Sequence, residues 1–169
     1  YTVLARLYEV QTGEIALTRR VAVLGADWQT LEPMLLEPPA EPMGVPLGEP
    51  SLLQLQGVTW QEQTETALRF TLVWQATSVA RGDYTRFVHL VVDPSQPPVA
   101  QADGLPDRNG YPTSQWAEGE RVADPIVLDI SQLPAGRYEV WTGFYDTNGR
   151  LPTNQANNAV FVGEVVIGE

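Results

Sequence analysis

Short stretches in which apolar and polar residues alternate, separated by glycine and proline, run through most of this chain. The clearest lies at residues 68–75, where Leu68, Phe70, Leu72 and Trp74 recur at every second position. A period of two places such side chains on one face of a β-strand. Helical periodicity is almost absent, and 14 glycines and 14 prolines divide the chain into short segments. We therefore predict an all-β fold, an antiparallel β-sandwich of immunoglobulin-like or jelly-roll type.

Further segments rich in valine, threonine and aromatic residues are predicted to be strands. They are residues 52–60, 87–92, 126–130, 138–145 and 160–167. Residues 138–145 are apolar on both faces, which is typical of a central strand. Asn148-Gly149 directly after this segment indicates a tight hairpin turn.

The charge and the missing residue types narrow the classes of function. The net charge is −11 and all ten basic residues are arginines, so the surface repels phosphate backbones and anionic lipid headgroups. We therefore expect no nucleic-acid partner. The chain has no cysteine, which removes disulfides, thiolate nucleophiles and cysteine-based metal sites. No apolar run approaches the ~20 residues of a membrane span, so we expect no direct membrane insertion by this chain, and we expect no cofactor.

Composition divides the chain into three parts. Residues 1–31 are predicted to be an N-terminal β-hairpin, residues 32–50 a Glu-Pro-rich extended linker, and residues 51–169 the β-sandwich domain. Proline excludes a helix or an interior strand in the linker. Val45 and Leu47 indicate that it lies against the sandwich.

The first residues resemble later parts of the same chain. Residues 1–8 (YTVLARLY) parallel residues 138–145, and they also fit residues 84–90. The hairpin is either the tail of an upstream copy of the sandwich or a supplier of strands to this one. Because the chain opens inside a strand-like segment, we expect it to be a piece of a longer protein. A lone hairpin is marginally stable in water, so we expect it to dock on the main body.

Several motifs in the second half of the chain occur together in a fixed order. They are Phe87-Val88-His89-Leu90, Ala100-Gln101-Ala102-Asp103, Tyr111-Pro112-Thr113-Ser114-Gln115-Trp116, Gly119-Glu120, Asp124, Leu133-Pro134-Ala135-Gly136-Arg137-Tyr138, Gly143-Phe144-Tyr145-Asp146 and Gly149-Arg150-Leu151-Pro152. With these motifs, residues 52–168 resemble the extracytoplasmic C-terminal β-sandwich domain of bacterial multi-spanning membrane proteins. Many of those proteins are dolichyl-phosphate-mannose-type glycosyltransferases. The sequence departs from this pattern at Val91-Val92, where an extra residue precedes Asp93.

The resemblance implies an accessory domain outside the cytoplasm rather than a catalytic one, and it supplies no ligand. The transferase itself is not expected here, because the chain has neither membrane spans nor an Asp-x-Asp pair for a metal–sugar-phosphate site.

His89, the only histidine, has two readings. It alternates with Val88 and Leu90, so it faces away from the core if those valine and leucine side chains face into it. In the functional reading it contacts a ligand or acts as an acid–base group. In the structural reading it bonds to Asp103 or to the backbone of the long loop that follows, and holds that loop down.

Aromatic residues around Gly143 form the second candidate site. Trp116, Trp141 and Tyr145 could stack on sugar rings, and Gly143 leaves room for a group to approach. Alternatively, that group is the protein's own loop, with Trp116 as the plug. The three other tryptophans are predicted to be packing residues: Trp28, Trp60 and Trp74.

Two weaker motifs remain. Asp103, Asp107 and Asp124, with Asn109, could supply oxygens to calcium, although such residues commonly cap turns and the spacing is not that of an EF-hand. Arg81-Gly82-Asp83 spells an integrin-recognition tripeptide, but a Gly-Asp turn between strands explains it.

These observations favour a non-catalytic extracytoplasmic interaction or scaffolding module of a larger bacterial membrane protein, with a glycan or a protein as its partner. A carbohydrate-binding module using Trp116, Trp141, Tyr145, His89 and Asp103 is the alternative. A glycoside hydrolase with a carboxylate pair is a further alternative among the 21 acidic residues, but no local pattern singles out a pair.

Overall fold

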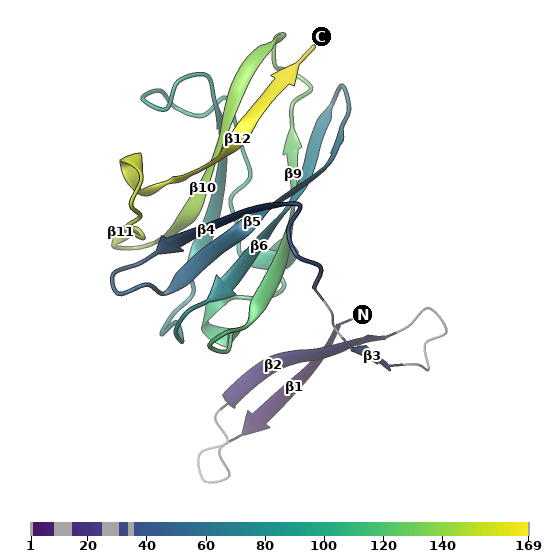
Figure 1. The fold of residues 1–169 in the computed structure, drawn as a ribbon, viewed down its shortest axis with the longest axis vertical. Coiled ribbons are helices and arrows are strands. Elements are labelled where there is room, and N and C mark those ends of the chain that lie inside the picture. The colour runs from purple at the N-terminus through teal and green to yellow at the C-terminus, as the bar shows by residue number, and fades with distance from the viewer. Residues whose placement is uncertain (1, 9–14, 25–30, 34–35, 169) are drawn as a thin grey trace.

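The computed structural model describes residues 2–8, 15–24, 31–33 and 36–168, with side chains from Leu36 onward. It shows an all-β protein in which two antiparallel sheets pack face to face as a sandwich (Figure 1). The predicted fold class, an antiparallel β-sandwich, is confirmed. The helical turns in the described residues are three or four residues long, and none could cross a bilayer as an apolar helix.

One sheet has the strand order β4-β5-β6-β9. Its strands are β4 (Glu41–Leu47), β5 (Leu53–Gln63), β6 (Ala67–Ala76) and β9 (Arg121–Asp129). The predicted alternation in β6 is confirmed, because Leu68, Phe70, Leu72 and Trp74 are at most 4% exposed. These four side chains therefore form the inner face of the sheet.

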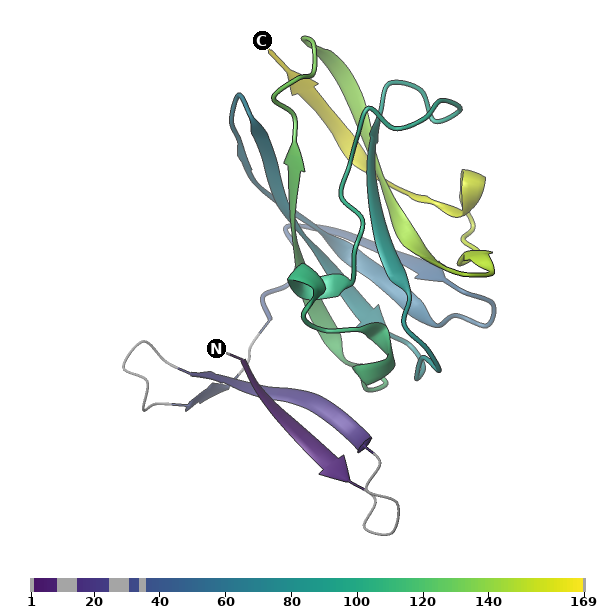
Figure 2. The ribbon, with the colours of Figure 1, turned by 180° about the vertical axis from the view of Figure 1, so that it is seen from behind.

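The other sheet is centred on β10 (Gly136–Asp146), which pairs with β7 (Thr85–Val91) on one side and with β12 (Val160–Ile167) on the other. Two short strands complete it, β8 (Ala100–Gln101) beside β7 and β11 (Gly149–Arg150) in the predicted hairpin with β10. The long segment between β7 and β9 crosses from this sheet to the first (Figure 2). It contains β8, α1 (Pro106–Asn109) and η1 (Thr113–Gln115); a further turn, η2 (Ala156–Asn158), precedes β12.

Tyr138 anchors the start of β10. Its side chain is 4% exposed, and its hydroxyl donates a hydrogen bond to the Pro134 carbonyl, 2.8 Å away. This bond to a carbonyl a few residues upstream is the tyrosine corner of immunoglobulin-type sandwiches. The motif Leu133-Pro-Ala-Gly-Arg-Tyr138 therefore has a structural role at a sheet-to-sheet crossing.

The Glu-Pro-rich segment differs from its predicted role as a linker. Residues 41–47 form β4, which pairs with β5, and Leu47 is fully buried in the core. Proline fits here because β4 is an edge strand with a register shift between Pro42 and Val45, where missing donors cost little. The sandwich therefore begins ten residues before the predicted boundary at residue 51, at Glu41.

The N-terminal residues form a sheet of their own. β1 (Thr2–Tyr8), β2 (Ile15–Leu24) and β3 (Leu31–Pro33) pair in that order, so the predicted hairpin has a third strand. Among the described residues, these strands pair with no strand of the sandwich, so they do not supply strands to it. β2 contacts η1. Trp28 lies outside the described residues.

The hydrogen-bond register gives one point of comparison for the internal repeat. The pairing of β1 with β2 shifts between Val3 and Leu4, and that of β10 with β12 shifts between Val140 and Trp141. Aligning residues 1–8 with 138–145 places Val3 on Val140, so both irregularities coincide. A second shift in β1, between Leu7 and Tyr8, has no counterpart in the pairing of β10 with β12, so the register does not select one of the two alignments.

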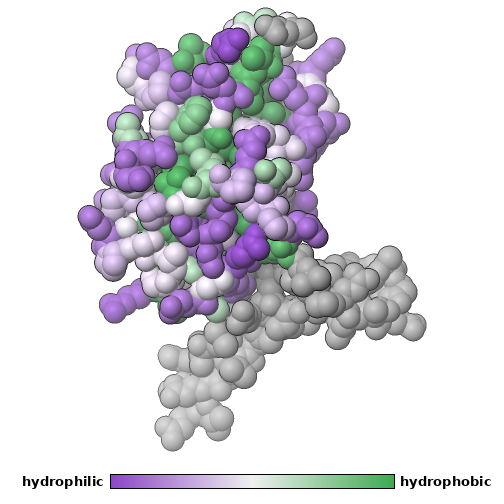
Figure 3. Space-filling view, viewed as in Figure 1, coloured by the Kyte–Doolittle hydropathy of each residue, from purple (hydrophilic) through white to green (hydrophobic). Residues whose placement is uncertain are grey.

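Hydrophilic residues cover most of the face seen in Figure 3, with hydrophobic residues visible in its middle. β4 and β12 are edge strands of their sheets. Trp60 closes part of the space between these edges, since it packs on Phe70 with ring centroids 4.9 Å apart and also covers Gly163 of β12.

Candidate functional site

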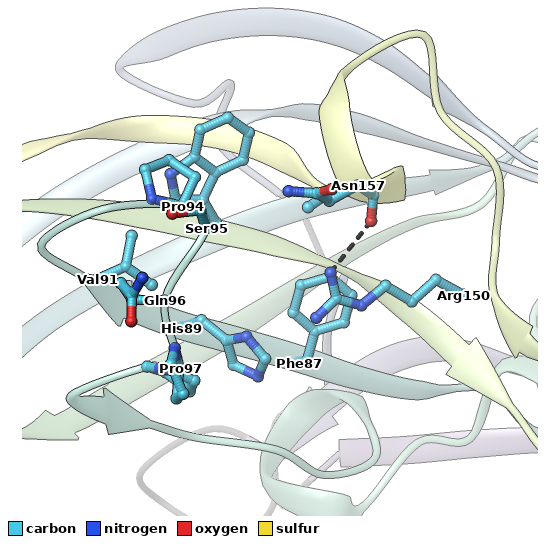
Figure 4. A pocket seen from close by; sticks show the side chains of 12 residues that line it. Phe87, His89, Val91, Pro94, Ser95, Gln96, Pro97, Arg150 and Asn157 are labelled. Carbon is cyan, nitrogen blue, oxygen red and sulfur yellow. Dashed lines mark hydrogen bonds between the residues drawn. The ribbon is translucent and has the colours of Figure 1, made fainter.

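A cavity of about 330 Å³ lies on the outer face of the β7–β10 sheet (Figure 4). Its lining comprises Phe87, His89, Val91, Pro94, Ser95, Gln96, Pro97, Pro98, Trp141, Arg150, Asn157 and Ala159. They come from β7, β10, β11, η2 and the start of the long loop. The cavity thus combines two of the predicted site residues, His89 and Trp141, with a wall formed by the long loop that follows His89.

Strand alternation and register bring His89 and Trp141 together. Val88 and Leu90 are fully buried in the core, so His89 faces outward, as the alternation predicted. His89 is the cross-strand partner of Trp141, and Phe87 is the partner of Gly143. Directly opposed residues lie within about 5.5 Å of one another, which places His89 and Trp141 in one site.

The group that approaches Gly143 is Phe87. A Cβ atom on Gly143 would lie 2.7 Å from the Phe87 ring, so only glycine leaves room for that ring. The Arg150 guanidinium lies over the ring, 4.3 Å from its centroid, and Phe87 is only 1% exposed. The predicted loop plug at Gly143 is therefore wrong, because a strand neighbour fills that space.

His89 is held in a partly buried position. Its ring centroid lies 4.8 Å from that of Phe87, and its Nε2 atom lies 3.7 Å from Oδ1 of Asp103. The Tyr145 hydroxyl is 3.4 Å from the other carboxylate oxygen of Asp103. Burial lowers the pKa of His89 from its usual 6.5, Asp103 opposes this, and the Arg150 charge adds to it. A neutral imidazole offers one donor and one acceptor to a ligand.

Trp116 does not join the predicted aromatic platform. It is 2% exposed and packs edge-on against Phe144 in the core, with ring centroids 6.3 Å apart. Phe144 and Gly143 are consecutive residues of one strand, so they point to opposite faces of the sheet. Trp116 plugs the sandwich between its sheets, while Trp141 and Tyr145 lie on the other side of β10.

The loop around Trp116 satisfies its own polar groups. The Trp116 indole N–H donates to the Tyr111 carbonyl at 3.0 Å, and the Tyr111 hydroxyl donates to the Glu120 carboxylate at 2.9 Å. Glu120 also accepts the Ala117 N–H at 2.9 Å. The motif residues from Tyr111 to Glu120 therefore fold the loop onto the core.

A buried ion pair joins the two sheets where the long loop crosses. Nε of Arg86 on β7 lies 3.0 Å from Oδ2 of Asp124 on β9, with side-chain exposures of 7% and 0%. Arg86 also donates to the Ala102 carbonyl, and Asp124 accepts the Asp107 N–H at 2.9 Å. Burial raises the pKa of Asp124, whereas Arg86 and the Asp107 N–H lower it.

Sequence reasoning did not single out Arg86, although a signal was present. Arg86 is two residues before Val88, so it shares the inward face of its strand with that valine. Asp124 lies two residues from both Val122 and Ile126, so it too occupies an inward position. Opposite charges at inward positions of two strands predict a buried pair, because an unpaired buried charge is too costly.

The calcium candidates are engaged in other contacts. Asp124 forms the ion pair with Arg86 and accepts a hydrogen bond from the backbone N–H of Asp107. Asp103 lies beside His89. Asn109 accepts the Leu105 N–H through its side chain at 2.7 Å. Within the described residues, no group of three or more His, Cys, Asp or Glu side chains is arranged to hold a metal ion.

Other sequence candidates lie outside the cavity. Trp74 is fully buried, which agrees with its predicted packing role. Arg81-Gly82-Asp83 is exposed between β6 and β7, and the Asp83 carboxylate accepts the Ser114 N–H at 3.2 Å.

Two other grooves lie away from the cavity. One, of about 450 Å³, is bordered by Trp60 and by three glutamates: Glu41, Glu62 and Glu164. Glu62 lies 3.3 Å from Arg69, and Glu164 lies 3.7 Å from Arg137. The other, of about 520 Å³, runs between the β4–β5 turn and the β6–β7 loop.

No protein-family model matches this chain, and no curated protein matches it either. The resemblance to the extracytoplasmic sandwich domain therefore stays a prediction.

Proposed function

We propose that this chain is a non-catalytic, extracytoplasmic interaction module of a larger bacterial membrane protein, a glycosyltransferase, and that the cavity beside His89 is its binding site. The observation that carries the proposal is the cavity itself, about 330 Å³ on the outer face of a rigid sheet. Other polar contacts stabilise the fold, namely the ion pair between Arg86 and Asp124 and the hydrogen bond between Tyr111 and Glu120. Loops seated on a rigid sheet are where binding residues concentrate.

The chemistry of the cavity supports binding without catalysis. Among the described residues that line it, none is a carboxylate, so it offers no acid pair for glycoside hydrolysis. Ser95 is the one hydroxyl-bearing side chain among the described residues that line the cavity, and its backbone N–H donates to the Asp93 carboxylate at 2.8 Å. The pKa of Asp93 is lowered by its hydrogen bonds from the backbone and side chain of Ser95. Among the contacts of the described residues, none joins the serine hydroxyl to His89, as a nucleophile and its base would require.

The strand order supports an immunoglobulin-like topology. Counting from β5, the first, second and fifth strands share one sheet, and the third, fourth, sixth, seventh and eighth strands share the other. In immunoglobulin-type sandwiches the first, second and fifth strands likewise share one sheet and the third and sixth share the other, and a tyrosine corner is present. Accessory domains with this architecture are common on cell surfaces, which fits an extracytoplasmic module.

The location can be tested with an introduced thiol, because the chain has no cysteine. Ser131, exposed after β9, is changed to Cys in the parent protein, and intact cells are treated with a membrane-impermeant maleimide. Labelling before lysis is expected, with the unsubstituted parent as the control. Labelling only after lysis would contradict an extracytoplasmic location.

Carbohydrate binding is the second candidate, and the position of Trp141 favours it. This half-buried indole lines the cavity beside hydroxyl- and amide-bearing side chains, and its N–H donates to Glu139 at 2.8 Å. An indole fixed in this way offers a rigid apolar surface to a sugar ring.

A glycan array with the full chain tests both the cavity and its ligand class. Retained glycans are expected to be lost in Trp141→Ala, and to persist in the control Trp60→Ala, which removes an indole outside the cavity. Circular dichroism confirms that each variant is folded. Binding that survives Trp141→Ala would move the site elsewhere, and turnover of a retained glycan would overturn the non-catalytic role.

A further inference from the structure

We propose that the cavity binds a carboxylate-bearing sugar, such as a terminal uronic acid unit, with the carboxylate at Arg150 and the ring against Trp141. This inference rests on the proposed binding role of the cavity and adds the charge of the ligand to it.

Arg150 is positioned to receive an anion. Its guanidinium is stacked on Phe87 at 4.3 Å, and one terminal nitrogen donates to the Asn157 carbonyl at 3.1 Å (Figure 4). None of the ion pairs formed by the described side chains involves Arg150. A guanidinium has five N–H donors in a planar fork that matches a carboxylate, so donors are left for a ligand. The two existing contacts hold the fork in place before the ligand arrives, which reduces the entropy lost on binding.

The charge of the cavity contrasts with that of the protein. The whole chain carries −11, which attracts cations and repels anions at long range. Among the described residues that line the cavity, Arg150 is the one with a formal charge, since burial favours the neutral form of His89. Asp103 lies beside His89 but does not line the cavity. The formal charge of the described lining is therefore positive, in contrast to that of the whole chain.

The rest of the lining fits a sugar ring. Trp141 and the prolines of the 94–98 loop provide apolar surface, while His89, Gln96 and Asn157 can bond to hydroxyl groups. The volume of about 330 Å³ is at the lower end of the range for small-ligand sites. This size suits one terminal ring better than an extended chain.

The test compares methyl glucuronide and methyl galacturonide with methyl glucoside and methyl galactoside, using the full chain. Binding is followed by NMR, in which the single histidine gives an unambiguous imidazole signal. We expect the uronates to bind at least about tenfold more tightly than the neutral sugars, since a hydrogen bond to a charged group contributes about 1.5–3 kcal/mol. A bound uronate is also expected to raise the pKa of His89, because a nearby anion favours the imidazolium.

Arg150→Gln is expected to reduce uronate affinity about tenfold and to abolish the preference for uronates over neutral sugars. Arg137→Gln is the matched control, because it removes the same charge from a side chain that is 77% exposed outside the cavity. Thermal unfolding confirms that both variants are folded.

The other possible outcomes distinguish a failure of this inference from a failure of the proposed function. Equal binding of uronates and neutral sugars would overturn the inference and leave carbohydrate binding intact. If Arg150→Gln and Arg137→Gln lost the same uronate affinity, the loss would reflect the net charge of the protein, and the inference would also be overturned. Binding of neither sugar class would overturn the inference together with the carbohydrate candidate.

Discussion

The stability of the junction between the two sheets depends on the ion pair between Arg86 and Asp124, and replacing one carboxylate oxygen of Asp124 by an amide nitrogen tests this. Asp124→Asn preserves the shape of the side chain and an oxygen for the Asp107 N–H, but it removes the charge that balances Arg86. The exposures of 7% and 0% mean that solvent cannot replace the missing partner. Loss of one member of a buried pair costs about 3–5 kcal/mol. For a chain of this size, we expect a Tm lower by roughly 6–20 °C.

The matched control is Glu62→Gln, which breaks the ion pair with Arg69. That pair has a similar separation of 3.3 Å, but its side chains are 46% and 58% exposed. An exposed pair contributes less than about 1 kcal/mol. Urea denaturation of both variants measures the free energy of unfolding from the midpoint, with an unchanged slope as the check that the same surface unfolds. Equal losses in the two variants would refute the reasoning, because only burial distinguishes the pairs.

Three further changes test other parts of the fold. Trp116→Ala is expected to destabilise the protein by about 3–5 kcal/mol in urea denaturation, because it empties a fully buried indole site; a loss below 1 kcal/mol would contradict its role as a plug. Gly143→Ala should cost about 1–3 kcal/mol by thermal unfolding, because its Cβ would lie 2.7 Å from the covered Phe87 ring, whereas the control Gly82→Ala, with nothing within 4 Å, should be neutral. The pKa of His89 in an NMR titration should lie below 6.5, because burial lowers it. The unfolded chain then binds the proton more tightly, so the contribution of His89 to stability is fully present above about pH 6.5 and is lost as the pH falls below it; a pH dependence of stability that is unchanged in His89→Gln would contradict this.

The strand framework was predictable because alternation is a local property. The period of two in residues 68–75 depends only on the geometry of an extended chain, and all four apolar residues there lie in the core. The hairpin at Asn148-Gly149 follows in the same way from the backbone freedom of its turn residues. The role of residues 41–47 was not predictable, because an extended proline-rich sequence is compatible with both a linker and an edge strand. Only a partner strand distinguishes the two.

The candidate site was predicted in part. Alternation placed His89 outside the core, and the register then set it opposite Trp141. Trp116 was placed on the wrong side of the sheet, because a loop residue has no period that reveals its direction. Arg150 was not considered as a site residue, since its contact with Phe87 depends on how the β10–β11 hairpin folds over the sheet.

The sequence by itself determined the all-β class, most of the strands and the inward or outward direction of residues in the alternating strands, such as β6 and β7, because these follow from backbone geometry within a few neighbouring residues. The tertiary structure decided which residues meet. It joined Arg86 to Asp124 across the two sheets, put Trp116 between the sheets, and set Arg150 beside His89 and Trp141. Those contacts connect residues far apart in the chain, so they depend on register and on the paths of the loops, which no local pattern specifies.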